Sequence, residues 1–409
     1  MDFSYSPEVE ELRGRLTEFM DSHVYPAESV YRAQMKESGD PHHHPAILEE
    51  LKKEARSRGL WNLFLPDDEH GGGLSVLDYA PLAEITGRSP WIAPEALNCS
   101  APDTGNMEIL HMFGTPEHKE VWLHPLLEGE IRSCFSMTEP DIASSDATNI
   151  RTRIERDGDD YVITGRKWFS SGAASPRCKV SIVMGVTNPD ADRHRQQSMV
   201  IVPLDTAGVE IEREPTVFGY QDRGGHPQIN FDGVRIPAAN LLGEEGGGFA
   251  IAQARLGPGR IHHCMRSIGA AERSLDLMIQ RSQSRKPFGR LLSEQGVVRE
   301  WIADARIRIE QTRLLVLKTA WMIDNIGTKG ARTEIAAIKV AAPELLTFVA
   351  DRAIQLFGAA GFTDDWPLAE FYSMGRWLQM ADGPDEVHRR SVARAEIGRL
   401  GPGAEFRSD

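Results

Sequence analysis

The stretch Phe135-Ser-Met-Thr-Glu-Pro-Asp-Ile-Ala-Ser-Ser-Asp146 marks the point where the pattern of this chain changes. An apolar, strand-like approach ends at Pro140, which lacks an N–H and fixes φ, so regular strand pairing stops there. The hydroxyl side chains and backbone N–H groups that follow can hold a polar heterocycle or a phosphate. The alternative is a plain strand end with turns and a helix cap, which is the commoner use of these residues.

The residues on either side of this stretch follow two different hydrophobic periods. Residues 1–130 and 244–409 repeat apolar positions at helical spacing. Residues 131–243 alternate with period two, with turn residues at short intervals and no helix between consecutive strands. The chain is therefore predicted to be an α+β protein, divided at those boundaries into an N-terminal helical domain, a central antiparallel β-barrel domain and a C-terminal four-helix bundle.

Start and stop signals place the expected helices within the two helical parts. They cover a segment that begins at Pro7, then residues 45–58, 76–89, 98–113 and 116–127, a long segment from about 249 to the break at Arg285, and residues 293–326, 332–357 and 384–399. The three adjacent histidines His42–His44 lie between prolines and predict a solvated loop. Gly246–Gly248 predict a flexible start to the C-terminal part.

The bulk composition excludes several classes of protein. The 409 residues carry a net charge of −14, whereas a nucleic-acid binder has a basic surface. The four cysteines are scattered and form no Cys-x-x-Cys pair, which indicates neither a disulfide framework nor a zinc site. No apolar run reaches the roughly 18 residues of a membrane span, and the first residues are acidic, unlike a leader. We therefore expect a cytoplasmic protein without a membrane span.

Common catalytic motifs are absent from the sequence. It contains no P-loop, no His-Glu-x-x-His and no Gly-x-Ser-x-Gly. Gly243–Gly248 is glycine-rich, but its two glutamates would repel a phosphate. His262 and His263 have no carboxylate or cysteine at metal-ligand spacing, so a structural role is predicted for them and no metal site is expected.

Five segments, in this order along the chain, resemble the motifs of acyl-CoA dehydrogenases. Each motif is weak alone, but five in register make a chance agreement improbable. The segments are Thr138-Glu-Pro140 with the following Ser-Asp, Lys167–Gly172, Arg285–Gly289 with Gln295, Gln355–Gly361, and Ala381–Val387.

The resemblance implies FAD as the cofactor, bound without a Rossmann fold. Thr138 would lie near the pyrimidine edge of the flavin, Trp168 would shield one side of the ring, and Ser170 would hydrogen-bond near N5. Arg285 would meet the pyrophosphate of an FAD bound mainly by a neighbouring subunit. The residues that the resemblance assigns to the cofactor are Phe135, Met137, Thr138, Trp168, Phe169, Ser170, Arg285, Phe288, Gln295, Gln355, Gly358, Ala359, Pro384, Asp385 and Glu386.

The reaction that the resemblance implies needs a carboxylate base. It removes the α-proton of an acyl-CoA thioester as H⁺ and the β-hydrogen as hydride to flavin N5, so a carboxylate must lie against Cα while the thioester carbonyl is polarised. Asp382 matches that carboxylate, where most relatives carry Glu, and its backbone N–H would polarise the thioester oxygen. The local alternative is that Asp382 caps the helix after Pro384.

The substrate residues follow from the same resemblance. The second base position of some relatives falls in Gly257–Gly259, where no carboxylate stands. Ser144 or Ser145 would contact the CoA chain, with one residue more here than in the commoner motif. The full set assigned to the substrate is Ser144, Ser145, Gly257, Pro258, Gly259, Arg260 and Gly383.

The residues of these motifs are most similar to those of one subgroup, whose dehydrogenase part is fused in animals to a kinase-like domain. The resemblance implies an acyl-CoA substrate, an electron-transfer flavoprotein as acceptor, a role in fatty-acid β-oxidation, and a homotetramer built as a dimer of dimers. Two other functions stay open. One is a flavin-dependent oxidase such as the nitroalkane oxidases, which also use Asp as base. The other is a flavin-retaining structural or assembly protein without catalysis.

Overall fold

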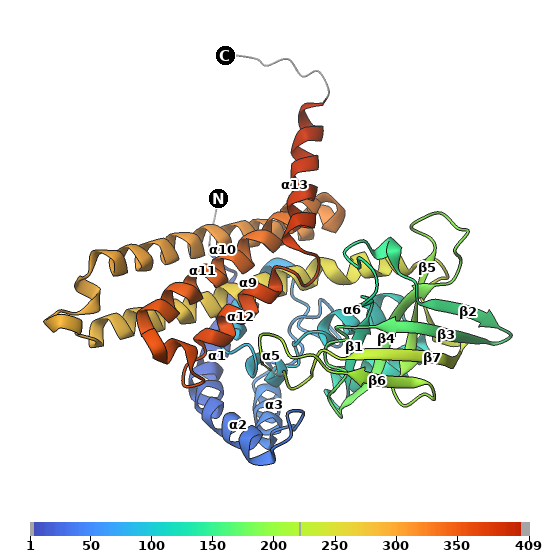
Figure 1. Cartoon of the computed structure of the whole chain (residues 1–409), viewed down its shortest axis with the longest axis horizontal. Coiled ribbons are helices and arrows are strands. Elements are labelled where there is room, and N and C mark those ends of the chain that lie inside the picture. The colour runs from blue at the N-terminus through green and yellow to red at the C-terminus, as the bar shows by residue number, and fades with distance from the viewer. Residues whose placement is uncertain (1–3, 221, 402–409) are drawn as a thin grey trace. The chain divides into compact units, whose positions relative to one another are not determined.

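The computed structural model describes residues 4–220 and 222–401, except for the side chains of residues 256–258. The chain forms two compact units, each built from separate segments. The sheet unit comprises Phe19–Leu74 and Pro94–Gly259, and the helical unit comprises Met1–Glu18, Ser75–Ala93 and Arg260–Asp409. Figure 1 shows the strands and the long helices that characterise them.

The sheet unit holds all the described strands, which follow the period-two segment of the sequence. Its strands are β1 (Arg132–Ser136), β2 (Arg153–Asp157), β3 (Asp160–Lys167), β4 (Cys178–Val186), β5 (Gln197–Pro203), β6 (Val209–Arg213), β7 (Gln228–Pro237) and β8 (Leu241–Leu242). They form one sheet in the order β6-β7-β3-β2-β4-β5-β8, with β1 paired to β4. Inward side chains such as Tyr161, Ile163 and Phe231 form its buried core.

The pairing of the strands is antiparallel along most of the sheet, as the sequence predicted. However, β1 and β2 each pair parallel with β4, which the sequence did not predict. A parallel pair needs a long crossover connection, and the hairpin of β2 and β3 between β1 and β4 provides one.

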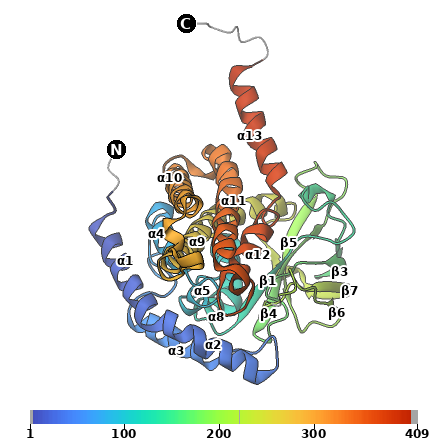
Figure 2. The same cartoon turned by 60° about the vertical axis from the view of Figure 1, so that its left-hand side comes forward.

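Helices complete the sheet unit. They are the π-helical turn Met20–Val24, α2 (Tyr25–Ser38), α3 (Ala46–Ser57), α5 (Ala93–Ala96), α6 (Asp103–Phe113), α7 (Pro116–His118), the π-helical turn Lys119–Leu123, α8 (His124–Leu127) and the first turns of α9 (Gly248–Ser284). In Figure 2, α2 and α3 lie side by side. Apolar positions such as Leu48, Leu51 and Ala55 give α3 one buried face.

The helical unit is built around α11. It contains α1 (Pro7–Phe19) as far as Glu18, α4 (Val76–Gly87), α9 from Arg260, α10 (Gly296–Gly330), α11 (Arg332–Phe357), α12 (Leu368–Leu378) and α13 (Asp385–Leu400). Helix α11 packs against α10, α12 and α13, and the last turns of α13 project beyond the other helices in Figures 1 and 2. No helix in the described part of the chain is long and apolar enough to cross a membrane.

Two glycines let α4 and α9 cross at very short range within the helical unit. A Cβ on Gly87 would lie 2.2 Å from the Arg266 carbonyl oxygen, and one on Gly269 would lie 2.0 Å from that of Glu84. Each added methyl group would collide with backbone, which cannot move aside as a flexible side chain can. The crossing therefore requires glycine at both positions.

The structure corrects three local predictions. The predicted helix 98–113 begins only at Asp103, because Asn98 has a φ of +53° that a helix cannot include. The histidine loop is not solvated, since the rings of His42 and His44 bond to Arg223 and are only about one-fifth exposed. Gly246–Gly248 are buried rather than flexible, because the Gly246 N–H donates to Ser198 Oγ of β5 at 2.8 Å and a Cβ on Gly248 would lie 2.8 Å from the Gln197 carbonyl oxygen.

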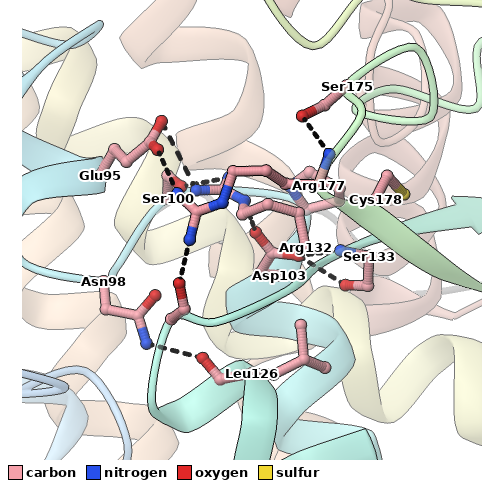
Figure 3. Close-up of polar contacts among 12 residues, drawn as sticks. Glu95, Asn98, Ser100, Asp103, Leu126, Arg132, Ser133, Ser175, Arg177 and Cys178 are labelled. Atoms are coloured by element: carbon pink, nitrogen blue, oxygen red, sulfur yellow. Dashed lines mark hydrogen bonds and ion pairs between the residues drawn. The ribbon is translucent and has the colours of Figure 1, made fainter. Parts of the chain in front are cut away.

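A buried cluster of charges holds the start of β1 to the helices of the sheet unit (Figure 3). The Glu95 carboxylate lies 3.6 Å from Arg132, 3.5 Å from Lys52 and 4.0 Å from Arg177, and it also pairs with Arg223. Its side chain is only 6% exposed. A buried carboxylate among so many cations stabilises the fold only while all the partners are present.

Arg132 carries the charge cluster into the first strand. It forms an ion pair with Asp103, and its guanidinium also donates to Ser100 Oγ at 2.6 Å. Asp103 in turn accepts from the backbone N–H and the hydroxyl of Ser133, both at 2.6 Å (Figure 3). The start of α6 and the start of β1 are thus fixed to each other by side chains.

Glu108 on α6 is a second buried carboxyl of the sheet unit, and it lacks such partners. Its side chain is 5% exposed, and its Oε2 has no hydrogen-bond partner among the described residues. Burial raises the pKa of Glu108 to about 8, although the nearby Arg255 acts in the opposite direction. The folded protein therefore holds this carboxyl neutral at pH 7.

The free energy of unfolding should consequently depend on pH through Glu108. Below about pH 4.5 both states are protonated, but from there to about pH 8 only the unfolded chain ionises, which favours unfolding. From about pH 5 to about pH 7.5, the free energy of unfolding of the wild type should fall by roughly 3 kcal/mol more than that of Glu108→Gln. Urea unfolding at both pH values measures this difference. The exposed Glu117→Gln should follow the wild type, and equal losses in wild type and Glu108→Gln would contradict the prediction.

Candidate active site

Asp382 lies in the short connection between α12 and α13 of the helical unit. Its backbone has a φ of +56°, a strained conformation for a residue with a side chain. The side chain is about one-quarter exposed. A strained, half-buried carboxylate that the surroundings hold in place is typical of a functional position.

Three basic side chains from three different helices hold the backbone of this connection. Lys339 of α11 is buried, and its ammonium donates to the carbonyl oxygens of Leu378 and Ala381, both at 2.9 Å. Arg260 of α9 donates to the carbonyl oxygen of Asp382 at 3.1 Å, and His388 Nε2 of α13 lies 3.2 Å from the same oxygen. The carbonyl groups are therefore fixed from the protein side.

Burial lowers the pKa of two of these groups. It lowers the pKa of His388 to about 4, with the charge of Arg260 acting in the same direction, so the imidazole is neutral at pH 7. Burial also lowers the pKa of Arg260, although the Asp382 carboxylate opposes that shift. A Cβ on Gly383, whose φ is +100°, would lie 2.9 Å from His388 Nε2, so this position requires glycine.

The carboxylate of Asp382 has a neighbour that the sequence did not indicate. His263 Nε2 lies 3.8 Å from Asp382 Oδ2, one helical turn after Arg260 on α9. The sequence predicted a structural role for His263 and did not indicate this contact with Asp382. By contrast, its neighbour His262 is buried against Tyr79, with ring centroids 4.8 Å apart, as a structural residue would be.

The alternative of Asp382 as a helix cap is wrong. Helix α13 begins at Asp385, its N-cap residue is Pro384, and no side chain caps it. Asp385 is buried in the first turn, and burial raises its pKa, with Glu344 adding to the effect. Glu386 is exposed beside it.

The sheet unit holds the residues predicted to contact the flavin, which the fold brings together from two segments. Strand β1 ends at Ser136, just before Met137 and Thr138, and β3 ends at Lys167, just before Trp168. The Trp168 N–H donates to the Thr138 carbonyl at 3.0 Å, and the Thr138 hydroxyl donates to the Trp168 carbonyl at 2.7 Å. We call residues 135–138 together with 168–170 the flavin wall.

Hydroxyl groups line the inner side of the flavin wall. Ser136 bonds to both Ser170 and Ser181, each at 2.8 Å, and all three side chains are fully buried. The Ser170 hydroxyl thus has a partner within the chain. Phe169 is 43% exposed with a φ of +50°, which marks the wall as strained on its outer side.

Ser144 and Ser145 differ in their surroundings. The Ser144 hydroxyl accepts from the Glu139 N–H at 2.9 Å and donates to the Glu139 carbonyl at 3.1 Å. Ser145 is exposed. This difference favours Ser145 as the residue that is open to a ligand.

The remaining cofactor motifs lie at the surface of the helical unit. Phe288 is fully exposed with a φ of +52°, and Arg285 beside it is also exposed. Gln355, Gly358 and Ala359 are exposed at the end of α11, and Gln295 is the N-cap residue of α10. The Arg281 guanidinium lies 5.0 Å from the centre of the Phe357 ring, which brings the end of α9 to the end of α11.

The predicted substrate segment Gly257–Gly259 lies within α9, where the side chain of Pro258 is outside the description. Gly259 has open space where a Cβ would be. Across the described residues, no three His, Cys, Asp or Glu side chains come close enough together to hold a metal ion.

Known proteins match nearly the whole of this chain. Residues 6–130, 134–234 and 246–397 match the N-terminal, middle and C-terminal domains of acyl-CoA dehydrogenases. A protein of Mycobacterium tuberculosis described as "Probable acyl-CoA dehydrogenase FadE2" is 61% identical over 400 residues, 98% of each chain. The human acyl-CoA dehydrogenase family member 11 is 52% identical over 389 residues, 94% of this chain and 49% of the human protein. This chain thus spans about half the length of the vertebrate family member 11 proteins that it matches.

A solved structure described as "Structure of a putative acyl-CoA dehydrogenase from Mycobacterium abscessus" superposes with a TM-score of 0.95. It is 51% identical and covers 98% of this chain and all of its own. The helical–β–helical order and the flavin motifs define an FAD-dependent oxidoreductase. The chain belongs to the acyl-CoA dehydrogenase family.

The residues present fit FAD chemically. Aromatic faces at Trp168 and Phe169 suit a planar ring, buried hydroxyls lie behind them, and the exposed guanidinium of Arg285 suits a pyrophosphate.

Proposed function

We propose that this protein dehydrogenates an acyl-CoA thioester to the trans-2-enoyl-CoA, with Asp382 as the base that removes the α-proton. The observation that carries the proposal is the Asp382 loop. Its carboxylate is only partly exposed, and Lys339, Arg260 and His388 fix the backbone on which it stands. A general base must be held at a fixed position against the proton that it takes.

The chain's own groups would orient the substrate. Because carbonyl oxygens of the loop are bonded to basic side chains, the loop has a defined direction, and the Asp382 N–H is the group that we assign to the thioester oxygen. Gly383 would allow close approach of the backbone, and Ser145 would contact the CoA chain. Bound FAD supplies the acceptor for the β-hydride.

The other cofactor residues are part of the same proposal. The flavin ring of FAD would contact Thr138, Trp168 and Ser170 of the flavin wall. Phe288 supports an FAD shared between subunits, because a fully exposed phenylalanine in a strained backbone suits burial against a second copy. We therefore propose a homotetramer, with Arg285, Gln295 and the Gln355–Ala359 segment serving the neighbour's FAD.

The cellular role follows from the family. We propose fatty-acid β-oxidation in the cytoplasm, with an electron-transfer flavoprotein as acceptor. The division into domains at residues 1–130, 131–243 and 244–409 belongs to this proposal as well. It is supported by the change of hydrophobic period at those positions.

A second candidate is a flavin-dependent oxidase similar to nitroalkane oxidases, because the base is Asp and not Glu. Anaerobic mixing of the FAD-loaded protein with a panel of acyl-CoAs, and separately with nitroalkanes, tests the two. Loss of flavin absorbance with an acyl-CoA, stable after O₂ is admitted, is the expected result. Loss of flavin absorbance with nitroalkanes only, reversed by O₂, would establish the oxidase. Unchanged absorbance with both acyl-CoAs and nitroalkanes would indicate a non-catalytic protein.

A further inference from the structure

The ammonium of Lys167 is buried directly behind the flavin wall. The residue has no exposed surface, and its Nζ donates to the Met137 carbonyl at 2.9 Å and to Glu139 Oε1 at 2.9 Å. Lys167 is the last residue of β3 and precedes Trp168, just as Met137 precedes Thr138. The two segments of the wall are therefore joined through this lysine as well as through the Thr138–Trp168 bonds.

Glu139 keeps the lysine charged. Its Oε1 accepts from the Thr152 N–H at 2.8 Å and the Thr152 hydroxyl at 2.6 Å, and its Oε2 accepts from the Arg151 N–H at 2.9 Å. Burial would raise the pKa of Glu139, but Lys167 and these donors lower it on balance. Burial lowers the pKa of Lys167 to about 8, against the opposing effect of Glu139. At pH 7 both groups are therefore ionised.

A buried ion pair such as Lys167–Glu139 loses most of the hydration of both charges, which is costly. Apolar residues of similar size would avoid that cost. Here the lysine has a further partner, the carbonyl of Met137, and so fixes the orientation of a peptide in the flavin wall. A charge in a site of low dielectric also acts strongly on a nearby redox group. These two effects are separable by substitution.

We propose that Lys167 is a positioning residue for FAD, and that Glu139 maintains its charge. The inference rests on the proposed FAD site. Lys167 fixes the Met137–Thr138 peptide that meets the ring, and its positive charge balances the Glu139 carboxylate, which would otherwise oppose the transfer of electrons to FAD.

The test compares Lys167→Met, Glu139→Gln and, as a matched control, Lys179→Met, an exposed lysine of the same sheet. FAD affinity is measured by titrating the apoprotein, and the midpoint potential by anaerobic dye equilibration. Lys167→Met should bind FAD at least about tenfold more weakly and lower the potential by about 30 mV or more, a tenfold change for a two-electron couple. Glu139→Gln should not lower the potential, and Lys179→Met should match the wild type.

The outcomes are distinct. The electrostatic role of Lys167 would be overturned by equal midpoint potentials in Lys167→Met and the wild type. It would also be overturned if Lys167→Met and Glu139→Gln both lowered the midpoint potential. If Lys167→Met does not fold, the double substitution Lys167→Met with Glu139→Met removes both charges and keeps an apolar fit. It should bind FAD more weakly at an unchanged potential, and unchanged affinity would overturn the positioning role. Failure of wild type and Lys179→Met to bind FAD would instead refute the proposed function.

Discussion

Asp382→Asn should bind FAD as the wild type does but reduce the rate of flavin reduction by an acyl-CoA about 10²–10⁴-fold. The amide has almost the same shape as the carboxylate and cannot accept the α-proton, and general bases contribute about 10²–10⁴-fold to such steps. The backbone bonds to Arg260, Lys339 and His388 use carbonyl groups, so they should survive the substitution. Anaerobic stopped-flow absorbance of the flavin measures the rate.

Two further variants make the result of Asp382→Asn specific. Asp364→Asn, at an exposed position of the same helical unit, should reduce flavin at the wild-type rate. Asp382→Glu keeps a carboxylate, on a side chain one methylene longer, and should retain a measurable rate. Undiminished reduction in Asp382→Asn would remove Asp382 from the role of base.

Glu95→Gln should lower the free energy of unfolding by about 3–5 kcal/mol. The amide cannot balance the buried charges of Arg132, Arg223 and Lys52, and breaking one side of a buried ion pair costs about that amount. The effect should appear as a lower urea midpoint for loss of the sheet unit's structure, followed by circular dichroism.

Glu128→Gln is the matched control for the charge cluster. Glu128 also pairs with an arginine, Arg56, but its side chain is 60% exposed. Exposed pairs contribute little because water screens them, so the urea midpoint should stay near that of the wild type. Equal effects of the two substitutions would show that burial does not decide the contribution of Glu95.

Much of the fold could be predicted from the sequence because hydrophobic period is a local property. The long helix α11 begins and ends at the predicted residues 332 and 357. The errors occur where a distant contact overrides a local signal. His42 and His44 have the local sequence of solvated loop residues. However, they bond to Arg223 and Glu214, which lie about 170–180 positions away in the chain.

The candidate site was predicted only in part. Asp382 and Arg260 were indicated by resemblance to family motifs, which record residue types at fixed spacing. Lys339 and His388 belong to no such motif. Nothing in the local sequence shows that they bond to backbone carbonyl groups at the Asp382 loop. The sequence predicted a structural role for His263 because the nearby carboxylate, Asp382, is more than a hundred residues away in the chain.

The sequence by itself determined the order of helical and β segments, the family, the cofactor and the carboxylate proposed as base. Only the tertiary structure decided which groups surround that carboxylate, that Lys167 and Glu139 form a buried pair behind the flavin wall, and that Phe19–Leu74 packs in one unit with the sheet. The physical reason is that period and motif are local along the chain. Charge pairing and burial depend on residues brought together by folding, and no local pattern specifies those partners.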